Sequence, residues 1–290
     1  MNLCDINEIK ALLARHGFHF SRSMGQNFLI RDWVPRDIAS ASGAGPGTGV
    51  LEIGPGIGPL TRELSLLSDR VTAVELDESL LPILDETLAD RDNVTVIPGD
   101  IMRFDLDRVV DGEFPGLTPM VCANLPYNIT TPVITRLLEC RRFARVTVMI
   151  QKEVAQRICA GPGTADYGAF SVLCQYYSKP EYLFDVPASC FLPAPKVTSA
   201  VVRMTVQRPP DLVEDREFFF RVVRAAFAQR RKTLVNSLSS ALNTGLSKEE
   251  TAAALKVCGL PPDVRGERLG IPEFAALARA LRRTAAAREP

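Results

Sequence analysis

Residues 50–58 read Val-Leu-Glu-Ile-Gly-Pro-Gly-Ile-Gly, an apolar run followed at once by a glycine-rich turn. The run Val50–Ile53 predicts a short buried strand, and the glycines predict a turn whose backbone can approach a ligand closely. Helical spacing in residues 59–67 predicts a helix that begins at this turn. The glycine spacing matches neither a dinucleotide fingerprint nor a P-loop, so a pyrophosphate cradle is disfavoured.

The alternation of strand and helix continues on both sides of this turn. We expect helices at 5–16, 31–42, 59–67, 79–90, 130–140, 151–159 and 168–178, and strands at 50–53, 70–76, 94–97, 119–123, 146–150, 182–186 and 199–206. The polar, glycine-bearing stretch 20–30 predicts an ordered loop, and two prolines predict an extended chain at 191–197. Such alternation predicts βαβ units, and therefore an α/β fold with a mainly parallel sheet. The last two strands have no long helix between them, so we expect them to pair antiparallel.

The C-terminal part reads differently from the rest of the chain. Gln207–Asp211, which contains two adjacent prolines, is the best candidate for a linker. After it the pattern predicts only helices, at 215–242, 247–258 and 271–287. We therefore expect a larger α/β domain at 1–208 and a small α-helical domain at 209–290.

Composition excludes several classes of protein. The chain has 290 residues, 46% hydrophobic and 23% charged, as expected for a globular protein. No apolar run reaches the ~20 residues of a membrane span and no secretory pattern opens the chain, so we expect a cytoplasmic protein without membrane contact. Seven scattered cysteines and only two histidines indicate reduced thiols and no metal site. Residues 1–179 hold 17 basic and 22 acidic residues, whereas 180–290 hold 17 and 12, which favours a polyanionic partner for the later part.

Each strand exit in the first half carries a group suited to binding. Glu75 ends the second strand, where a carboxylate can accept hydrogen bonds from a ribose, and Asp100 follows the third, where it can accept from an adenine amine. Residues 124–127, Asn-Leu-Pro-Tyr, follow the fourth strand and offer an amide, a carbonyl and a ring to a flat base. Taken singly, these residues also fit ordinary caps and turns. As an ordered set they predict a nucleoside-type cofactor at one sheet edge.

Seven motifs in order resemble the S-adenosylmethionine-dependent methyltransferases and, more narrowly, the small-subunit rRNA adenine N6,N6-dimethyltransferases. They are Gln26-Asn27-Phe28-Leu29, Glu52 to Gly58, Glu75-Leu76-Asp77, Gly99-Asp100, Asn124 to Tyr127, Phe191-x-Pro193-x-Pro195-Lys196-Val197 and Gln229 to Leu234. The resemblance implies a Rossmann-like methyltransferase domain and S-adenosylmethionine as the methyl donor.

The resemblance also implies roles for single residues. Asn27 and Leu29 would close over the donor, Gly54 would contact its methionine part, Glu75 its ribose and Asp100 its adenine amine. The donor-binding set is then Gln26, Asn27, Leu29, Gly54, Gly56, Glu75, Leu76, Asp100, Ile101 and Asn124. The site for the target base comprises Asn124, Leu125, Pro126, Tyr127 and Phe191.

The residues around Asn124 suit methylation of an adenine amine, which is a poor nucleophile because its lone pair is delocalised. The Asn124 side-chain oxygen and the Leu125 carbonyl can each accept one N–H, which polarises the nitrogen and aims its lone pair. Tyr127 would stack on the base, a contact worth roughly 1–3 kcal/mol. Phe191 would cover the other face, or it is an ordinary core aromatic.

Five cations in the stretch 218–238 of the expected helix predict contacts with RNA phosphates, the alternative being a solvated charged face. They are Arg221, Arg224, Arg230, Arg231 and Lys232.

The resemblance implies a monomeric enzyme that acts on two adjacent adenines in a hairpin loop near the 3′ end of small-subunit rRNA in an assembling subunit. Open alternatives are a large-subunit rRNA dimethyltransferase of the macrolide-resistance type, a non-catalytic ribosome-assembly or transcription factor on the same fold, and a DNA adenine methyltransferase.

Overall fold

The computed structural model describes residues 1–19, 26–242 and 245–286, and the chain divides into two compact units. Unit 1 comprises Met1–Ala155 and Ser178–Gln207, and unit 2 comprises Gln156–Tyr177 and Arg208–Pro290. Residues 156–177, which the sequence placed in the first domain, therefore belong to unit 2 in the structure. Residues 20–25 of the expected N-terminal loop lie outside the described residues.

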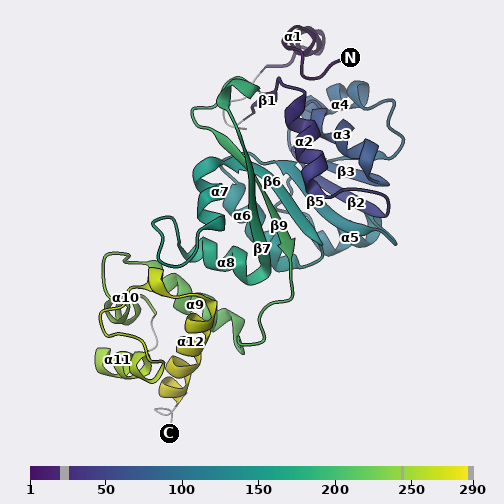
Figure 1. Ribbon diagram of the computed structural model, residues 1–290. Helices are drawn as coiled ribbons and strands as arrows, with labels where there is room; N and C mark the ends of the chain where they lie inside the picture. The colour runs from purple at the N-terminus through teal and green to yellow at the C-terminus, as the bar shows by residue number, and fades with distance from the viewer. Residues whose placement is uncertain (20–25, 243–244, 287–290) are drawn as a thin grey trace. The chain divides into compact units, whose positions relative to one another are not determined.

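Unit 1 is built on a seven-stranded sheet with the strand order β4-β3-β2-β5-β6-β9-β7 (Figure 1). The strands are β2 (Thr48–Ile53), β3 (Arg70–Glu75), β4 (Val94–Pro98), β5 (Thr118–Asn124), β6 (Arg145–Gln151), β7 (Ser178–Val186) and β9 (Ser199–Val206). Strands β2 to β6 pair in parallel, while β9 pairs antiparallel with both β6 and β7. The expected α/β fold and the antiparallel late strands are confirmed.

The chain reverses its direction of travel across the sheet beside β2. It runs outward from β2 to β3 and β4, then returns to place β5 on the other side of β2. At such a reversal the connections leave on opposite sides and open a crevice at the carboxyl ends of the strands. The turn after β2 and the turn after β5 flank this crevice.

Helices cover the sheet of unit 1. They are α1 (Ile6–Arg15), α2 (Trp33–Ser42), α3 (Pro59–Leu67), α4 (Leu81–Thr87), α5 (Leu106–Glu113) and α6 (Thr130–Cys140). Apolar residues of α2 and α3, among them Ile38 and Leu64, form one buried cluster with Val50, Met120 and Met149 from the strands. Helix α5 is not among the helices expected from the sequence, although Asp105 caps it by accepting from the N–H groups of Asp107 and Arg108.

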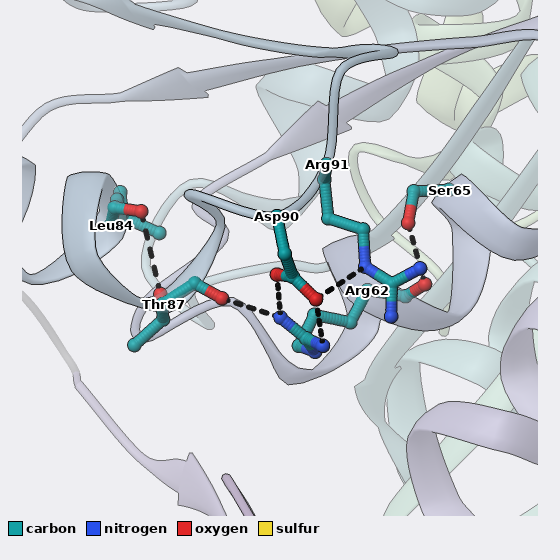
Figure 2. A network of polar contacts seen from close by, with 6 residues as sticks. All are labelled: Arg62, Ser65, Leu84, Thr87, Asp90 and Arg91. Carbon is teal, nitrogen blue, oxygen red and sulfur yellow. Dashed lines mark hydrogen bonds and ion pairs between the residues drawn. The ribbon is translucent and has the colours of Figure 1, made fainter. Parts of the chain in front are cut away.

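A bidentate ion pair anchors the helix that follows the glycine turn (Figure 2). Arg62 of α3 donates to both carboxylate oxygens of Asp90, at 2.6 and 2.9 Å, and to the carbonyl of Thr87 at 2.7 Å. Arg91 lies 3.7 Å from the same carboxylate. The hydrogen bonds from Arg62, helped by the charges of Arg62 and Arg91, lower the pKa of Asp90 to about 2. Helix α3 is thereby joined to the chain that leaves α4, which keeps the turn before it in place.

The N-terminal segment packs over the carboxyl ends of the strands. Leu12 and Leu13 of α1 share a buried cluster with Phe28, Ile57 and Leu84. Two short strands, β1 (Phe28–Leu29) and β8 (Phe191–Leu192), then form a separate antiparallel ribbon in which Phe28 faces Leu192 and Leu29 faces Phe191. The sequence had predicted a loop at 20–30 and an extended chain at 191–197, and it missed this pairing because the partners are far apart in the chain.

Unit 2 is helical, with α8 (Ala169–Tyr177), α9 (Arg216–Phe227), α10 (Leu234–Ala241), α11 (Lys248–Val257) and α12 (Ile271–Ala286). Helix α7 (Lys152–Cys159) contains the passage from unit 1 into unit 2. Phe219 and Phe220 of α9 pack on Tyr176 of α8, and Phe227 packs on Phe274 of α12. Each contact joins residues far apart in the chain.

The single helix predicted across 215–242 is wrong. The chain leaves the helix after Phe227 and turns at 228–233 before α10 begins. The N–H of Leu234 donates to the carbonyl of Val264 at 2.7 Å, and the Arg230 guanidinium donates to two carbonyls of the 160–168 loop. The N–H of Leu234 thus has a distant acceptor in place of a helical one, so helical periodicity alone does not reveal the break.

Close packing around β2 generates a first prediction. A Cβ at Gly49 would lie 2.3 Å from the ring of Phe114, which is itself buried. Gly49→Ala should therefore destabilise unit 1 by about 1–3 kcal/mol, because the ring must move. Urea unfolding followed by circular dichroism measures the change.

Gly112→Ala is the matched control, since Gly112 lies in α5 with nothing within 4 Å of an added Cβ. Alanine is the better helix former, so this variant should gain about 0.5–1 kcal/mol. Equal stability of the two variants would contradict the packing argument.

Candidate active site

A pocket opens in unit 1 at the crevice between the carboxyl ends of β2 and β5. Every residue expected to bind the donor or the target base lines it: Gln26, Asn27, Leu29, Gly54, Gly56, Glu75, Leu76, Asp100, Ile101, Asn124, Leu125, Pro126, Tyr127 and Phe191. The topology brings them together, because most follow strands of the main sheet that end at this edge, while Gln26, Asn27, Leu29 and Phe191 come from the β1–β8 ribbon and the residues before it. Their proximity is observed, whereas their individual roles stay predictions.

The turn after β2 supplies backbone rather than side chains. Gly54, Gly56 and Gly58 have φ values of 67°, 62° and 91°, in the left-handed region that favours glycine. A Cβ at Gly54 would meet nothing within 4 Å, so open space lies directly against the backbone there. The N–H of Gly54 donates to the carbonyl of Val74 on β3 at 2.9 Å, which holds the turn against the neighbouring strand.

Glu75 lies at the end of β3, and its carboxylate is largely buried at the pocket wall. One carboxylate oxygen accepts the N–H of Asp77 at 2.8 Å. Burial raises the pKa of Glu75, and hydrogen bonds from the backbone of Asp77, Gly56 and Leu76 oppose that rise. These bonds orient the carboxylate and join it to the glycine turn.

Asp77 is held in turn by the N-terminal segment. The side-chain amide of Gln26 donates to its carboxylate at 2.6 Å. Asn27, Phe28 and Leu29 follow directly and also line the pocket. A segment that the sequence places 50 residues before Asp77 is therefore fastened at the pocket mouth, where it can cover a ligand.

The loop after β4 presents Asp100 to the pocket. One Asp100 oxygen accepts the N–H of Met102 at 2.9 Å, and Ile101 beside it is buried. Arg136 of α6 donates to the carbonyls of Met102 and Phe104, which fixes the path of the loop from behind. The carboxylate is thus held in a defined place, half-exposed at the pocket wall.

Residues 124–127 form a stiff turn at the end of β5. The N–H of Leu125 donates to the carbonyl of Met149 at 3.1 Å, and the carbonyl of Pro126 accepts from Ile129 and Thr130. Within residues 1–19, 26–242 and 245–286, no hydrogen bond engages the Asn124 side-chain amide or the Leu125 carbonyl. Both groups therefore remain available to a ligand in the pocket they line.

Two aromatic residues border this turn. The Tyr127 hydroxyl lies 2.7 Å from the hydroxyl of Ser199, the first residue of β9, and this bond fixes the ring. Burial raises the pKa of Tyr127, so the phenol is neutral. Phe191 lines the pocket but is only 2% exposed and packs in the cluster of α2 and α3. Its ring therefore supports the core as well as the pocket wall.

Glu52 is a pocket residue to which the sequence analysis gave no role. It lies within β2, is 1% exposed, and its Oε2 atom has no hydrogen-bond partner among the described residues. Burial raises the pKa of Glu52 to about 8; the hydroxyl of Thr61 opposes the rise and the charge of Glu75 adds to it. The available signal was a single acid inside an otherwise apolar strand.

The charged residues that line this pocket are all acidic. They are Glu52, Glu75, Asp77 and Asp100, and the described lining contains no lysine, arginine or histidine. An isolated carboxylate away from water is costly unless it finds a cation or hydrogen-bond donors. The pocket therefore suits a ligand with hydroxyls, amines and positive charge, and not a bare phosphate.

The five predicted RNA-binding cations lie in unit 2 and differ in their surroundings. Arg221 and Arg224 are exposed on α9, with the Arg221 guanidinium 5.1 Å from the ring centroid of Phe218. Arg230 donates to the carbonyls of Ala165 and Tyr167 at 2.6 and 3.1 Å. Its guanidinium therefore holds the 160–168 loop.

Arg231 and Lys232 lie in the same turn and are exposed. Neither makes an ion pair within the part of the chain that the structure describes. Free positive charge in the 228–233 turn thus resides on Arg231 and Lys232.

Sequence comparisons give a consistent result. A family model described as ribosomal RNA adenine dimethylase matches residues 17–258. A ribosomal RNA small subunit methyltransferase A of Geobacillus thermodenitrificans is 49% identical over 276 residues, 94% of each chain. A protein of the same name from Moorella thermoacetica is 47% identical over 280 residues, 93% of this chain and 96% of that one.

Solved structures with the same fold include two that cover most of the chain. A dimethyladenosine transferase from Plasmodium falciparum matches with a TM-score of 0.73 and 24% identity, over 88% of this chain and 98% of that one. The 23S rRNA methyltransferase ErmE matches with a TM-score of 0.66 and 26% identity, over 88% of this chain and all of that one. The fold of these proteins is the one found here.

The burial of Glu52 generates a prediction about stability and pH. Its pKa is about 8 in the folded protein, against an ordinary value of 4.5. Its contribution to the free energy of unfolding is therefore complete below pH 4.5 and is lost as the pH rises to about 8, by about 1.4 kcal/mol per unit of pKa difference. Glu52→Gln, which mimics the protonated acid, should lose less stability over this range, as measured by urea unfolding between pH 5 and 8.5.

Glu63→Gln serves as the control, because Glu63 lies on α3 outside the pocket lining and shows no such burial. Its stability should follow the pH dependence of the unchanged protein. If the stability of Glu52→Gln showed the same pH dependence as that of the unchanged protein, Glu52 would be ionised in the folded state over this range.

Proposed function

The chain belongs to the ribosomal RNA adenine dimethylase family, and from this membership and the pocket we propose that it methylates adenines of small-subunit rRNA with S-adenosylmethionine as donor. The expected product is N6,N6-dimethyladenosine at two adjacent adenines of a hairpin loop near the 3′ end. The observation that carries the proposal is Asn124 beside Leu125, two free acceptors at one pocket. The reaction requires two successive transfers to each nitrogen.

The pocket fits the donor. S-adenosylmethionine supplies an activated methyl group on a positively charged sulfur, together with a ribose, an adenine and an amino acid end. Glu75 is oriented to accept from ribose hydroxyls, Asp100 is held where it can accept from an adenine amine, and Gly54 leaves open space against the backbone. The orphaned oxygen of Glu52 and the acid-only lining suit a ligand with a net positive charge.

The turn at 124–127 would hold the target amine. The Asn124 oxygen and the Leu125 carbonyl each accept one N–H, which turns the nitrogen lone pair toward the methyl group. Tyr127, held by Ser199, stacks on the base, and the base must first leave its own stack. No strong base is needed, because the methylated nitrogen becomes acidic and loses its proton to water.

Sequence identity to named relatives favours small-subunit rRNA over the other candidate substrates. The relatives at 47–49% identity are named small-subunit methyltransferases, whereas the 23S rRNA methyltransferase is 26% identical. An intact set of acceptors argues against a non-catalytic assembly or transcription factor.

We further propose that the protein acts as a monomer on an assembling small subunit in the cytoplasm, and that unit 2 contacts the RNA. In the part of the chain that the structure describes, no helix is both long and apolar enough to cross a membrane.

Donor binding and methyl transfer should separate in two variants. Glu75→Ala removes the ribose acceptor and should weaken S-adenosylmethionine binding ten- to hundredfold, measured by calorimetry. Asn124→Ala should weaken donor binding less but slow transfer roughly 10²–10³-fold, as for other removed polarising groups. Transfer is measured with radiolabelled donor on unmethylated small subunits.

The neighbouring Asn128 supplies the control, since it is exposed and does not line the pocket. Asn128→Ala should keep both binding and transfer. Label recovered in large subunits or DNA instead of small subunits would overturn the substrate assignment, and absence of donor binding would overturn the proposed function.

The 228–233 turn generates a prediction about RNA. Reversing Arg231 and Lys232 to glutamate should weaken RNA binding and lower its salt dependence by about one unit per lost phosphate contact. Arg230→Ala should instead lower stability, because the Ala165 and Tyr167 carbonyls lose their donor, at a cost of about 1–3 kcal/mol. Filter binding at several salt concentrations measures the RNA affinity, and thermal unfolding measures the stability. If the double variant at Arg231 and Lys232 bound RNA as tightly as the unchanged protein, these cations would be solvated surface charges and not RNA contacts.

A further inference from the structure

Glu52 is enclosed more deeply than the other acids that line the pocket. It is 1% exposed and lies in β2, between β3 and β5, beneath the glycine turn. Its Oε2 atom has no hydrogen-bond partner in the described chain, while the Thr61 hydroxyl on α3 lies near the carboxyl and offsets the effect of burial only in part. Burial and this lack of partners both favour the neutral form of the acid.

The groups around Glu52 offer it no positive charge. Glu75 faces it from β3, the Cys122 thiol from β5, and the Thr61 hydroxyl from α3. Ser42 of α2 lies beyond, near the Cys122 thiol, whose pKa is raised well above its usual value by burial. Asp77, Asp100 and Tyr127 complete the titratable lining, which holds no lysine, arginine or histidine among the described residues. The first cation that Glu52 meets must therefore arrive with a ligand.

The methyl donor and its product differ by one charge. In the transfer the amine lone pair forms the new N–C bond, the S–C bond electrons return to sulfur, and the amine proton leaves to water. The sulfonium cation thus becomes a neutral thioether, S-adenosylhomocysteine, while the amino acid end keeps its charges. A buried carboxyl in the same pocket experiences this difference strongly, because the interior screens charge weakly.

We propose, on the basis of the proposed function, that Glu52 distinguishes the methyl donor from its demethylated product by changing its own protonation. The carboxyl is neutral in the free protein, loses its proton to solvent when the sulfonium-bearing donor binds, and takes a proton back from solvent when the thioether remains. Once the methyl group has left, the sulfur is neutral and no longer attracts the Glu52 carboxylate. Two methylations of one nitrogen require exchange of product for donor. Reprotonation of Glu52 weakens product binding relative to donor binding and so favours that exchange.

Calorimetry on the full chain tests the proposal without RNA and without turnover. Donor binding at pH 7, measured in two buffers of different ionisation enthalpy, should release most of one proton, and product binding should release almost none. Donor affinity should rise about tenfold from pH 6.5 to 8.0, because the free carboxyl ionises over that range, while product affinity should change less than twofold.

Glu52→Gln should abolish both effects, so that the ratio of product to donor dissociation constants no longer varies with pH through this group. The amine of the ligand titrates equally with both proteins and cancels in the comparison. Glu63→Gln, outside the pocket, should behave as the unchanged protein. Thermal unfolding of the free variants at pH 7 verifies that each is folded.

The outcomes of these measurements distinguish the role of Glu52 from the proposed function. Donor binding without proton release in the unchanged protein, or equal pH dependence for donor and product, overturns the role of Glu52 and leaves the proposed function intact. Failure of the folded, unchanged protein to bind the donor at any pH overturns the proposed function itself. The proton count in the unchanged protein does not depend on how well Glu52→Gln folds.

Discussion

The parallel pairing of β2 with both β3 and β5 is the constraint on which the pocket depends. It aligns the carboxyl ends of three strands, so that the glycine turn, Glu75 and Asn124 arrive at one edge from separate parts of the chain. The reversal of chain direction beside β2 keeps the connecting segments from filling the space between them. Arg62, through Asp90, then fixes the helix that continues from the turn (Figure 2).

The ribbon of β1 and β8 adds a second constraint. Its backbone pairs Leu29, from the segment expected to cover the donor, with Phe191, from the segment expected to flank the target base. Gln26 fastens the same ribbon to Asp77 beside Glu75. The two segments are therefore joined to each other and to the end of β3 by hydrogen bonds at the pocket that they line. Tyr127 has its own support in Ser199, which is part of the main sheet.

Local patterns predicted much of this arrangement. Alternating strands and helices indicated the parallel sheet, and polar residues at strand ends, such as Glu75 and Asp100, indicated one shared edge. Helix α5 was missed although its capping signal at Asp105 is present. The break at 228–233 could not be predicted, because its hydrogen-bond partners, Val264 and the 160–168 loop, are distant in sequence.

The sequence by itself determined the order of the elements, the residue types at each strand end and the family resemblance, because these depend on local periodicity and spacing. Only the tertiary structure decided which groups are enclosed and which are free. Burial between two strands raises the pKa of Glu52 to about 8. Arg230 and Arg231 are both exposed, but only Arg230 donates to the carbonyls of the 160–168 loop. Protonation and availability depend on neighbours in space, and the neighbours of these residues come from distant parts of the chain.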